Sequence, residues 1–365
     1  MTPPESPADL PGAAIDRIGG PAAATGFRGS LAAWFRREAR DYPWRRTRDP
    51  YAILVSELML QQTQIATVLG RGYYERWMRA FPDWASLAAA PEESVIKHWE
   101  GLGYYNRARH LHRTARLISE DHGGRFPQDP ETALGLPGVG RYTVGAVLSF
   151  AYGLPLPLVD GNVGRVLARL LALGAAINSP AGLKVLWEWA ADLLDHGDPG
   201  THNSALMELG QRICRPTQPD CPACPVRAHC LAHRHDLTAS LPVKAKAATV
   251  TRRVERVVLA DRGGRIYLCP ESGSRRRGLW RLPEIDGEAA ADLAEILRFD
   301  YTITRYRVTL LVHAASVAWR PGAGPDREGA WFSLQDQEAW PPLGSPYRRA
   351  LGLYTDLRDS LDLKG

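Results

Sequence analysis

The stretch LPGVGRYT spans residues 136–143 and separates two apolar segments that have helical spacing. Gly138 and Gly140 carry no side chains, so the backbone N–H groups around Val139 could face an anion where a helix begins near Arg141. A Pro-Gly-x-Gly pattern is also common in ordinary turns between two helices. By itself the stretch predicts either a phosphate-binding hairpin or a simple connector, and the flanking sequence distinguishes the two.

The sequence on both sides of this turn predicts a helical domain followed by a smaller α+β domain. Apolar residues recur at three and four from Leu31 to about Ala205, as in an amphipathic helix bundle. From Val254, short β-branched or aromatic segments alternate with Gly-rich turns, which indicates strands, and residues 288–299 (EAAADLAEILRF) have a helical pattern. We therefore expect a disordered arm at 1–25, a helical domain at 26–235, a linker at 236–252 and an α+β domain at 253–365.

Composition excludes some classes of protein. The 365 residues are 45% apolar, which is enough for more than one core. A formal charge of +5 only mildly favours a polyanionic partner. No apolar run approaches the roughly 20 residues that a membrane helix needs, and the N-terminus lacks the basic-then-apolar pattern of a secretory signal. We expect a cytoplasmic protein with no membrane association.

Two carboxylates stand in positions that could carry chemistry. On a helix through residues 53–63, Glu57 would share its face with Ile53, Leu54 and Leu60, although a shifted frame would place it at the solvent edge. If it is buried, desolvation raises its pKa, so it can hold a proton near neutrality as a general acid must. Asp160 precedes the helical segment that starts at Gly161, so it is either a helix N-cap, an anion in a site, or both.

Four of the five cysteines lie within 17 residues. Cys214, Cys221, Cys224 and Cys230 have the spacing C-x6-C-x2-C-x5-C, with arginines between them. This clustering, without a secretory signal, favours a metal site in a reducing compartment over disulfides. Their thiolates suit either an iron–sulfur cluster or structural zinc. Cys269 lies far away in a strand-like stretch and is predicted to be a packing residue.

A basic and aromatic segment follows at residues 103–117, GYYNRARHLHRTARL. Its arginines and histidines could follow phosphates, or they could form a solvated helix face. The adjacent rings of Tyr104 and Tyr105 favour contact with nucleic acid, because flat rings beside basic residues can wedge between bases or stack on them.

Five motifs occur in one order: SELMLQQTQ (56–64), GLGYYNRAR (101–109), LPGVGRYT (136–143), LVDGNVGRVLAR (158–169) and CRPTQPDCPACPVRAHC (214–230). Together they resemble adenine DNA glycosylases of the MutY family, which belong to the helix-hairpin-helix, endonuclease III-like superfamily. The resemblance covers about residues 28–235 and extends more weakly to the C-terminal domain through GLWRLPE (278–284). It implies a mainly α, helix-hairpin-helix glycosylase with an iron–sulfur loop at 212–231 and a Nudix-like C-terminal domain, in which Gly138, Val139 and Gly140 hold the DNA backbone.

The resemblance also assigns catalytic roles. Glu57 would protonate the extruded adenine and later help to deliver water, and Asp160 would stabilise the cationic sugar, with Tyr142 and Asn162 supporting both carboxyls. Lyases of the superfamily carry a Schiff-base lysine at the position of Tyr142. Because tyrosine cannot form that adduct, the chain is expected to hydrolyse the base without cutting the strand.

Further residues are assigned by motif alone. Those implied to line the adenine pocket are Trp44, Arg45, Leu60 and Glu208, and those implied around the opposite base are Gln62, Thr63, Leu102 and Tyr104. The four clustered cysteines match the ligands of a [4Fe-4S] cluster. In the C-terminal domain the family's recognition loop usually carries Phe-Ser-His, whereas Ile303, Thr304 and Arg305 stand here. Thr304 keeps a hydroxyl, and no Glu-rich Nudix box is present.

The predicted partner is double-stranded DNA that carries adenine opposite 8-oxoguanine or guanine. Extruding a mispaired base costs less than extruding a paired one, which favours such substrates. We expect a monomer associated with a bacterial nucleoid. The alternatives are an endonuclease III-like lyase or thymine-mismatch glycosylase on the same fold, a catalytically silent DNA-damage-binding protein, and a zinc regulator.

Overall fold

The computed structural model describes residues 12–245, 249–271, 273, 277–303, 305–316, 319–320 and 328–362. The chain forms two compact units. The first unit holds the described residues up to Gln61 together with those from Leu117 to Ala245, and the second holds Gln62–Arg116 together with the described residues from Thr249 onward. The helical block is therefore shared between both units, and the division falls within one long helix, α8 (Asn106–Asp121).

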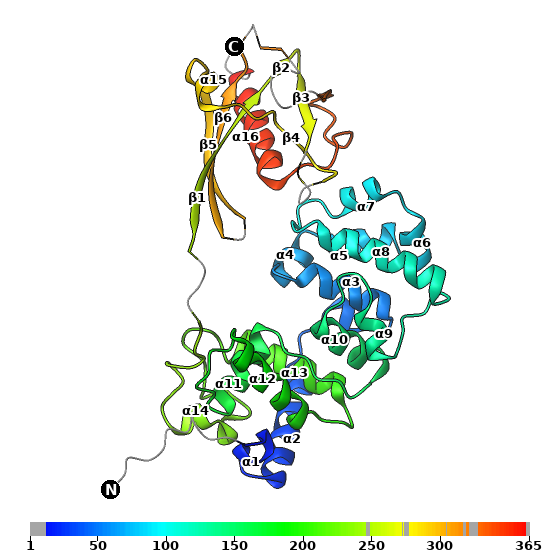
Figure 1. Cartoon of the computed structure of the whole chain (residues 1–365), viewed down its shortest axis with the longest axis vertical. Helices are drawn as coiled ribbons and strands as arrows, with labels where there is room; N and C mark the ends of the chain where they lie inside the picture. Colours follow the sequence, from blue (N-terminus) through cyan, green and yellow to red (C-terminus); the bar gives the residue numbers. More distant parts are fainter. Residues whose placement is uncertain are drawn as a thin grey trace. The chain divides into compact units, whose positions relative to one another are not determined.

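The described parts of the first unit and the N-terminal part of the second contain helices joined by loops, and no strand (Figure 1). In the first unit they are α1 (Ala14–Ile18), α2 (Pro21–Glu38), η2 (Pro43–Arg45), α3 (Pro50–Leu60), α9 (Pro130–Leu134), α10 (Arg141–Tyr152), α11 (Gly161–Leu170), α12 (Pro180–Leu193), α13 (Pro199–Arg212), η3 (Arg227–His229) and α14 (Leu231–Arg234). Before α8, the second unit contains α4 (Ile65–Gly70), α5 (Tyr73–Ala80), α6 (Trp84–Ala89) and α7 (Glu92–His98). Among the described residues, no helix has both the length and the apolar character required to cross a membrane.

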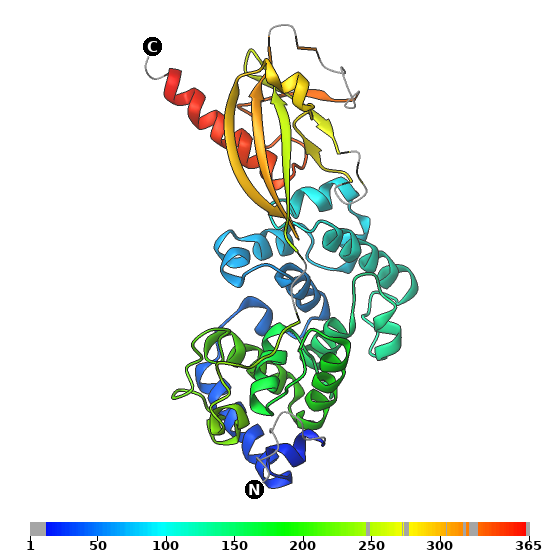
Figure 2. The same cartoon turned by 60° about the vertical axis from the view of Figure 1, so that its left-hand side comes forward.

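The C-terminal part of the second unit contains two small sheets. Strand β6 (Tyr306–Ala314) lies between β1 (Thr251–Leu259), to which it is parallel, and β5 (Glu295–Ile303), to which it is antiparallel, and Figure 2 shows these three strands side by side. The second sheet is formed by β2 (Asp261–Arg262), β3 (Arg265–Pro270), β4 (Trp280–Arg281) and β7 (Ala330–Ser333). Helix α16 (Ser345–Asp362) contributes Tyr347, Ala350 and Leu351 to a core that residues of both sheets share. These strands and α16 confirm the predicted α+β region.

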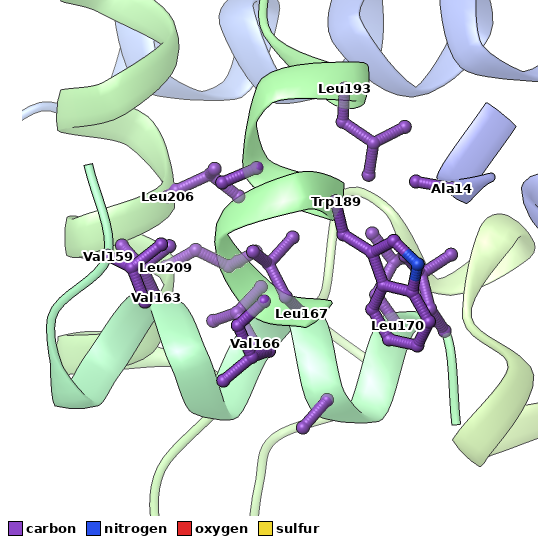
Figure 3. Packing of buried hydrophobic residues seen from close by; sticks show 14 of the residues in the cluster. Ala14, Val159, Val163, Val166, Leu167, Leu170, Trp189, Leu193, Leu206 and Leu209 are labelled. Carbon is purple, nitrogen blue, oxygen red and sulfur yellow. The ribbon is translucent and has the colours of Figure 1, made fainter. Parts of the chain in front are cut away.

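The core of the first unit surrounds α11. Its buried side chains include Val163, Val166 and Leu167, which point toward Trp189 of α12 and Leu209 of α13 (Figure 3). Burial of each such side chain contributes about 1.5–3 kcal/mol to folding. Because Asp160 is the residue immediately before α11, this packing places it and fixes the direction of its helix.

The expected disordered arm at 1–25 is ordered from Gly12 onward. Helix α1 begins at Ala14, and Ala14, Ile18 and Ala24 are buried in the core of the first unit. The backbone N–H of Ala14 donates to Asp192 at 3.0 Å. The Ala- and Gly-rich composition indicated disorder, but small apolar side chains at helical spacing pack against α12.

The helix predicted at 288–299 is wrong over most of its length. Only the short α15 (Gly287–Ala291) is helical, and β5 begins at Glu295. From Leu297 the residues alternate, so that Leu297, Phe299 and Tyr301 pack on the core of the domain. Pairing along the whole of β6 overrides the helix preference of the Ala-Glu-Leu run.

Cys269 is fully buried in β3, as expected of a packing residue.

The crossing between α10 and the segment before α11 depends on a glycine. A Cβ added at Gly145 would overlap with the carbonyl oxygen of Pro157, whereas one added at Gly29, on the exposed side of α2, would meet nothing within 4 Å. Both glycines lie inside helices and have no left-handed backbone.

We expect Gly145→Ala to lower the free energy of unfolding by about 1–3 kcal/mol, because the methyl group forces α10 away from Pro157. Gly29→Ala should raise it by roughly 0.5–1 kcal/mol, since alanine only reduces the freedom of the unfolded chain there. Urea unfolding followed by far-ultraviolet circular dichroism measures both values. Equal effects of the two substitutions would contradict this account.

Candidate active site

Glu57 is a buried carboxyl on a helix that is buried all round. Asp49 caps α3 by accepting from the backbone N–H of Tyr51, and Pro50 occupies the first helical position. Every residue from Tyr51 to Met59 is buried, and Glu57 itself is only 5% exposed. The alternative of a solvent edge is therefore excluded. Desolvation, and secondarily the charge of Asp160, raise the pKa of Glu57 to about 7, against the lowering effects of Tyr142 and Arg45.

Tyr142 is the polar partner of this carboxyl. It lies in the first turn of α10, which packs against α3, and its hydroxyl donates to Glu57 Oε2 at 2.7 Å. The same hydroxyl lies 3.8 Å from Met207 Sδ. Burial and the nearby carboxylates raise the pKa of Tyr142 well above its ordinary value. Tyr142 is therefore a neutral hydroxyl that holds Glu57 in one position.

Asp160 is both an N-cap and a member of the same cluster. Its Oδ1 accepts from the backbone N–H groups of Asn162 (2.9 Å) and Val163 (2.7 Å), and its Oδ2 accepts from Asn162 Nδ2 at 3.0 Å. Three N–H donors at a helix N-terminus suit a negative charge. The charge of Asp160 contributes to raising the pKa of both Glu57 and Tyr142. The structure thus brings the four predicted catalytic residues together.

Arg165, which was not predicted, forms a hydrogen bond with the side chain of Asn162. It is buried on α11, one turn after Asn162, and its Nη2 donates to Asn162 Oδ1 at 2.9 Å. The same guanidinium donates to the carbonyl oxygens of Gly210 (2.8 Å) and Cys214 (2.7 Å). Hydrogen bonds therefore run from Asp160 through Asn162 and Arg165 to the first cysteine of the loop. The i,i+3 spacing of Asn162 and Arg165 was the available sequence signal.

A second polar cluster contains three of the four residues assigned to the adenine pocket. Glu208 of α13 is fully buried and accepts from Arg45 Nη1 at 2.5 Å and from Arg212 Nη1 at 2.9 Å. The Arg45 guanidinium stacks over Tyr42, whose ring stacks on Trp44 with centroids 5.3 Å apart. Arg45 also lowers the pKa of Glu57 through its charge, which links this cluster electrostatically to Glu57.

The remaining pocket residue and two unpredicted ones complete this region. Leu60 ends α3, one turn beyond Glu57, and is partly buried. The backbone N–H of Arg40 donates to Glu208 Oε1 at 3.1 Å. A hydrogen bond with Tyr42 raises the pKa of Arg40. Arg40 and Tyr42 come shortly before the predicted Trp44 and Arg45 in the sequence. The aromatic and basic run at 40–46 could have pointed to them.

The turn at 136–143 connects α9 to α10 as a helical hairpin. Gly138 has φ +75°, a left-handed conformation that favours glycine, and Gly140 is the N-cap residue of α10. Both glycines are exposed, while Val139 between them is 4% exposed and anchors the turn. The bare backbone at the start of α10 therefore faces outward.

The four clustered cysteines lie beyond α13 and are partly buried. Cys214, Cys224 and Cys230 pack against the core of the first unit. Burial raises the pKa of Cys224 to about 12 and that of Cys230 to about 11, and the other thiols add to both effects. Arg169 Nη1 donates to Cys214 Sγ at 3.4 Å. Among the described residues, no group of three or more His, Cys, Asp or Glu side chains is arranged to hold a single metal ion.

The residues assigned to the opposite base belong to the second unit. Gln62 and Tyr104 are both exposed and both have a left-handed backbone, with φ +57° and +48°. Such strained non-glycine residues concentrate at functional sites. Thr63 is partly buried and Leu102 is 6% exposed, so Leu102 presents little surface. Thr304 lies outside the described residues.

The basic segment at 103–117 does not form one solvated face. Arg107 and His112 of α8 are buried, and Arg107 Nη2 donates to the carbonyl oxygens of Leu102 (3.0 Å) and Gly103 (2.9 Å). Desolvation lowers the pKa of Arg107 to about 10. This arginine therefore holds the loop before α8 instead of following phosphates.

Comparisons with known proteins show which family the sequence belongs to. Residues 55–191 match the model of the HhH-GPD superfamily of base excision DNA repair proteins. An adenine DNA glycosylase from Mycolicibacterium smegmatis is 39% identical over 233 residues, which cover 64% of this chain and 75% of the relative. The human adenine DNA glycosylase is 48% identical over 219 residues, 58% of this chain. The chain spans about two fifths of the length of the human, rat and mouse relatives, namely 40%, 42% and 42%.

Among solved structures, a thermostable thymine-DNA glycosylase superposes with a TM-score of 0.53 and is 32% identical, covering 58% of this chain and 97% of its own. The superfamily match at residues 55–191 includes Glu57, Tyr142 and Asp160. On the extent of its likeness to the M. smegmatis relative, the chain belongs to the adenine DNA glycosylases of the HhH-GPD superfamily.

Proposed function

We propose that the chain is a monofunctional adenine DNA glycosylase that hydrolyses the N-glycosidic bond of adenine mispaired with 8-oxoguanine or guanine in duplex DNA. One observation carries the proposal. Glu57, whose pKa burial raises to about 7, is held by the Tyr142 hydroxyl beside Asp160, which accepts three N–H groups. Two neighbouring carboxyls in such different environments are suited to acid and anion roles.

In the first step Glu57 acts in its protonated form. It gives its proton to a ring nitrogen of the extruded adenine, and the electron pair of the glycosidic bond then moves into the base. The neutral base leaves, and positive charge remains on the sugar. A pKa near 7 keeps a useful fraction of Glu57 protonated at neutral pH and leaves it acidic enough to donate.

In the second step the Asp160 carboxylate stabilises the sugar cation. Ionised Glu57 accepts a proton from water as the water oxygen bonds to the anomeric carbon, which regenerates the acid. The products are adenine and an abasic site. Tyr142 cannot form a Schiff base with that site, so no strand cleavage by a lyase step is expected.

The cluster around Glu208 supports an adenine pocket. Buried Glu208 holds the Arg45 guanidinium, which stacks over Tyr42 beside the Trp44 indole and contributes to the electrostatics of Glu57. The exposed hairpin glycines support backbone contacts to DNA that do not read sequence. Gln62, Thr63, Leu102 and Tyr104 would surround the opposite base, and the Nudix-like domain would read it through Thr304. The chain would act as a monomer.

The cysteine loop fits a [4Fe-4S] cluster. Cys214, Cys221, Cys224 and Cys230 would each bind a different iron, so their sulfurs need to stand further apart than the ligands of a single ion. The number and spacing of the four cysteines, and the likeness of their motif to that of the family, support this proposal. The bound cluster would cross-link the loop, and Arg169 would donate to the sulfur of Cys214.

Glu57→Gln should bind mispaired DNA as the wild type does but excise adenine roughly a hundredfold to ten-thousandfold more slowly, because the amide cannot donate the proton. Single-turnover rates on duplexes with adenine opposite 8-oxoguanine, guanine, cytosine or thymine measure this. Glu188→Gln, an exposed glutamate of α12, is the matched control. Excision by Glu57→Gln near the wild-type rate would refute the acid role, and release of mispaired thymine in place of adenine would refute the substrate.

The excision rate should fall as the pH rises through about 7, because only protonated Glu57 can act. The Tyr142 hydrogen bond lowers the pKa of Glu57, so Tyr142→Phe should move this fall to higher pH. Tyr152→Phe is the control, since that hydroxyl of the same helix donates to the carbonyl of Phe126. A profile that does not move in Tyr142→Phe, or moves to lower pH, contradicts the assignment.

The purified protein should contain iron and acid-labile sulfide in equal amounts and absorb in the visible blue. Cys224→Ser should reduce the iron content and the absorbance strongly, because serine replaces one ligand. Cys269→Ser, which changes a buried cysteine of β3, should retain both. Stoichiometric zinc without iron would contradict the cluster.

A further inference from the structure

The loop at 101–105, which presents Tyr104, has an unusual backbone. Gly101, Gly103 and Tyr104 all have left-handed conformations, with φ +93°, +71° and +48°. Glycine tolerates this, but tyrosine does so only when its surroundings hold it there. Because the Tyr104 side chain is 46% exposed, little packing of its own holds it. Other groups must therefore maintain the loop.

Part of the support comes from Trp99, the residue that follows α7, and from Arg107 of α8. Arg107 donates to two carbonyl oxygens of the loop, and Trp99 Nε1 donates to the carbonyl oxygen of Gly103 at 3.1 Å. The Arg107 guanidinium lies 5.3 Å from the Trp99 ring centroid and 5.4 Å from that of Tyr104. These contacts hold the middle of the loop and leave its two ends.

Both ends of the loop are bound by the C-terminal domain, within the same unit. Glu100, immediately before the loop, accepts from Arg348 Nε and Nη2 at 2.8 Å each and from the backbone N–H of Leu343 at 3.0 Å. Tyr105, at its other end, donates its hydroxyl to the Leu343 carbonyl at 3.2 Å. The Gly101 N–H donates to that hydroxyl at 3.4 Å and so closes the loop.

These contacts are sheltered from water. Tyr105 is 6% exposed, Leu343 is fully buried, and the side chain of Glu100 is 14% exposed. A bidentate Arg–carboxylate pair fixes orientation as well as distance. Lys97 adds a donor to the carbonyl of Trp340 at 2.5 Å. The junction between this loop and the C-terminal domain is therefore specific, not an incidental surface contact.

Contacts of α16 connect this junction to strand β5. Arg348 lies in the first turn of α16, and its neighbour Arg349 stacks over Phe299 of β5 with 4.3 Å to the ring centroid. Tyr347 donates to Glu255 of β1, and Tyr301 of β5 donates to the same carboxylate at 2.5 Å. Strand β5 ends at Ile303. One continuous set of contacts therefore joins β5 to the Tyr104 loop.

We infer that Glu100, Tyr105 and Arg348 are positioning residues for recognition of the base opposite the adenine. Through them the C-terminal domain sets the conformation of the loop that presents Tyr104. The inference rests on the proposed function for the role of Tyr104, but not on the chemical step. It assigns to the domain an indirect contribution to specificity, in addition to any contact of its own with the base.

Arg348→Met and Glu100→Gln each break the bidentate pair. We expect each to lower the preference for adenine opposite 8-oxoguanine over adenine opposite guanine by roughly threefold to tenfold in single-turnover excision, within the range by which coupled residues alter another site. A merely structural loss would slow both substrates equally. The double variant should lose no more preference than either single one, because both remove the same contact.

A binding measurement separates this inference from the chemistry. Dissociation constants are measured for duplexes that carry an abasic-site analogue opposite 8-oxoguanine or guanine, which need no excision. If the wild type binds them with a preference but excises no adenine, the proposed function fails while the inference is still tested by the change in that preference. Tyr105→Phe, which removes one hydroxyl only, should reduce the preference in the same direction without unfolding the domain.

The matched control is the exposed pair Glu295–Arg298, which has the same bidentate geometry at 2.8 Å. Glu295→Gln and Arg298→Met should leave the preference unchanged. The inference is overturned if Arg348→Met and Tyr105→Phe retain the wild-type preference in both excision and binding, if the control pair lowers it equally, or if the wild type shows no preference in either measurement.

Discussion

The hydrogen bond from the Tyr142 hydroxyl to Glu57 is the interaction on which the site depends. A carboxyl that is 5% exposed would destabilise the fold by several kcal/mol if it were charged and unpaired. Two features make its burial tolerable: it can stay protonated near neutral pH, and it has one polar partner at 2.7 Å. Tyr142 lies on α10, so α10 has to pack closely on α3. Gly145 of the same helix allows the backbone at Pro157 to approach α10. Burial of Glu57 therefore costs folding free energy, and the same burial raises its pKa to the value that its proposed acid role needs.

Asp160 differs from Glu57, because its proposed role needs a charged carboxylate, which hydrogen-bond donors stabilise. The N-terminus of α11 and Asn162 supply its three donors, and Arg165 orients Asn162 while also holding the carbonyl of Cys214. Gly210 fits against this arrangement, because an added Cβ would lie 2.7 Å from the Cβ of Asn162. The position of the anion thus depends on where the cysteine loop is anchored. A cross-link in that loop would therefore steady the site without taking part in the reaction.

Residues with a local signal were predictable from the sequence, and those defined by long-range contacts were not. Glu57 was identified by its apolar neighbours at helical spacing, and Asp160 by its place before a helix. Arg165 and Tyr42 had only weak local signals, because the bond from Arg165 to Cys214 spans 49 residues and the stacking of Tyr42 on Trp44 appears only in the structure. At 295–303, pairing with β6 outweighed local helix preference, and at 14–24 packing outweighed composition. The strained backbone of Tyr104 likewise follows from the loop's anchors, which lie more than 200 residues along the chain.

The distribution of residues between the two units follows from these physical demands. The groups that bond Glu57 and Asp160 are Tyr142, Asn162 and Val163, all in the first unit, where deep burial tunes acidity. Gln62 and Tyr104 lie in the second unit, exposed on strained backbone, where rigidity without burial presents a side chain to a partner. Burial and presentation are opposing requirements, and a single packed core cannot meet both at one position. Because the helices at 62–116 and the C-terminal domain belong to one unit, the proposed coupling through α16 and Glu100 would act without changing the surroundings of Glu57 in the other unit.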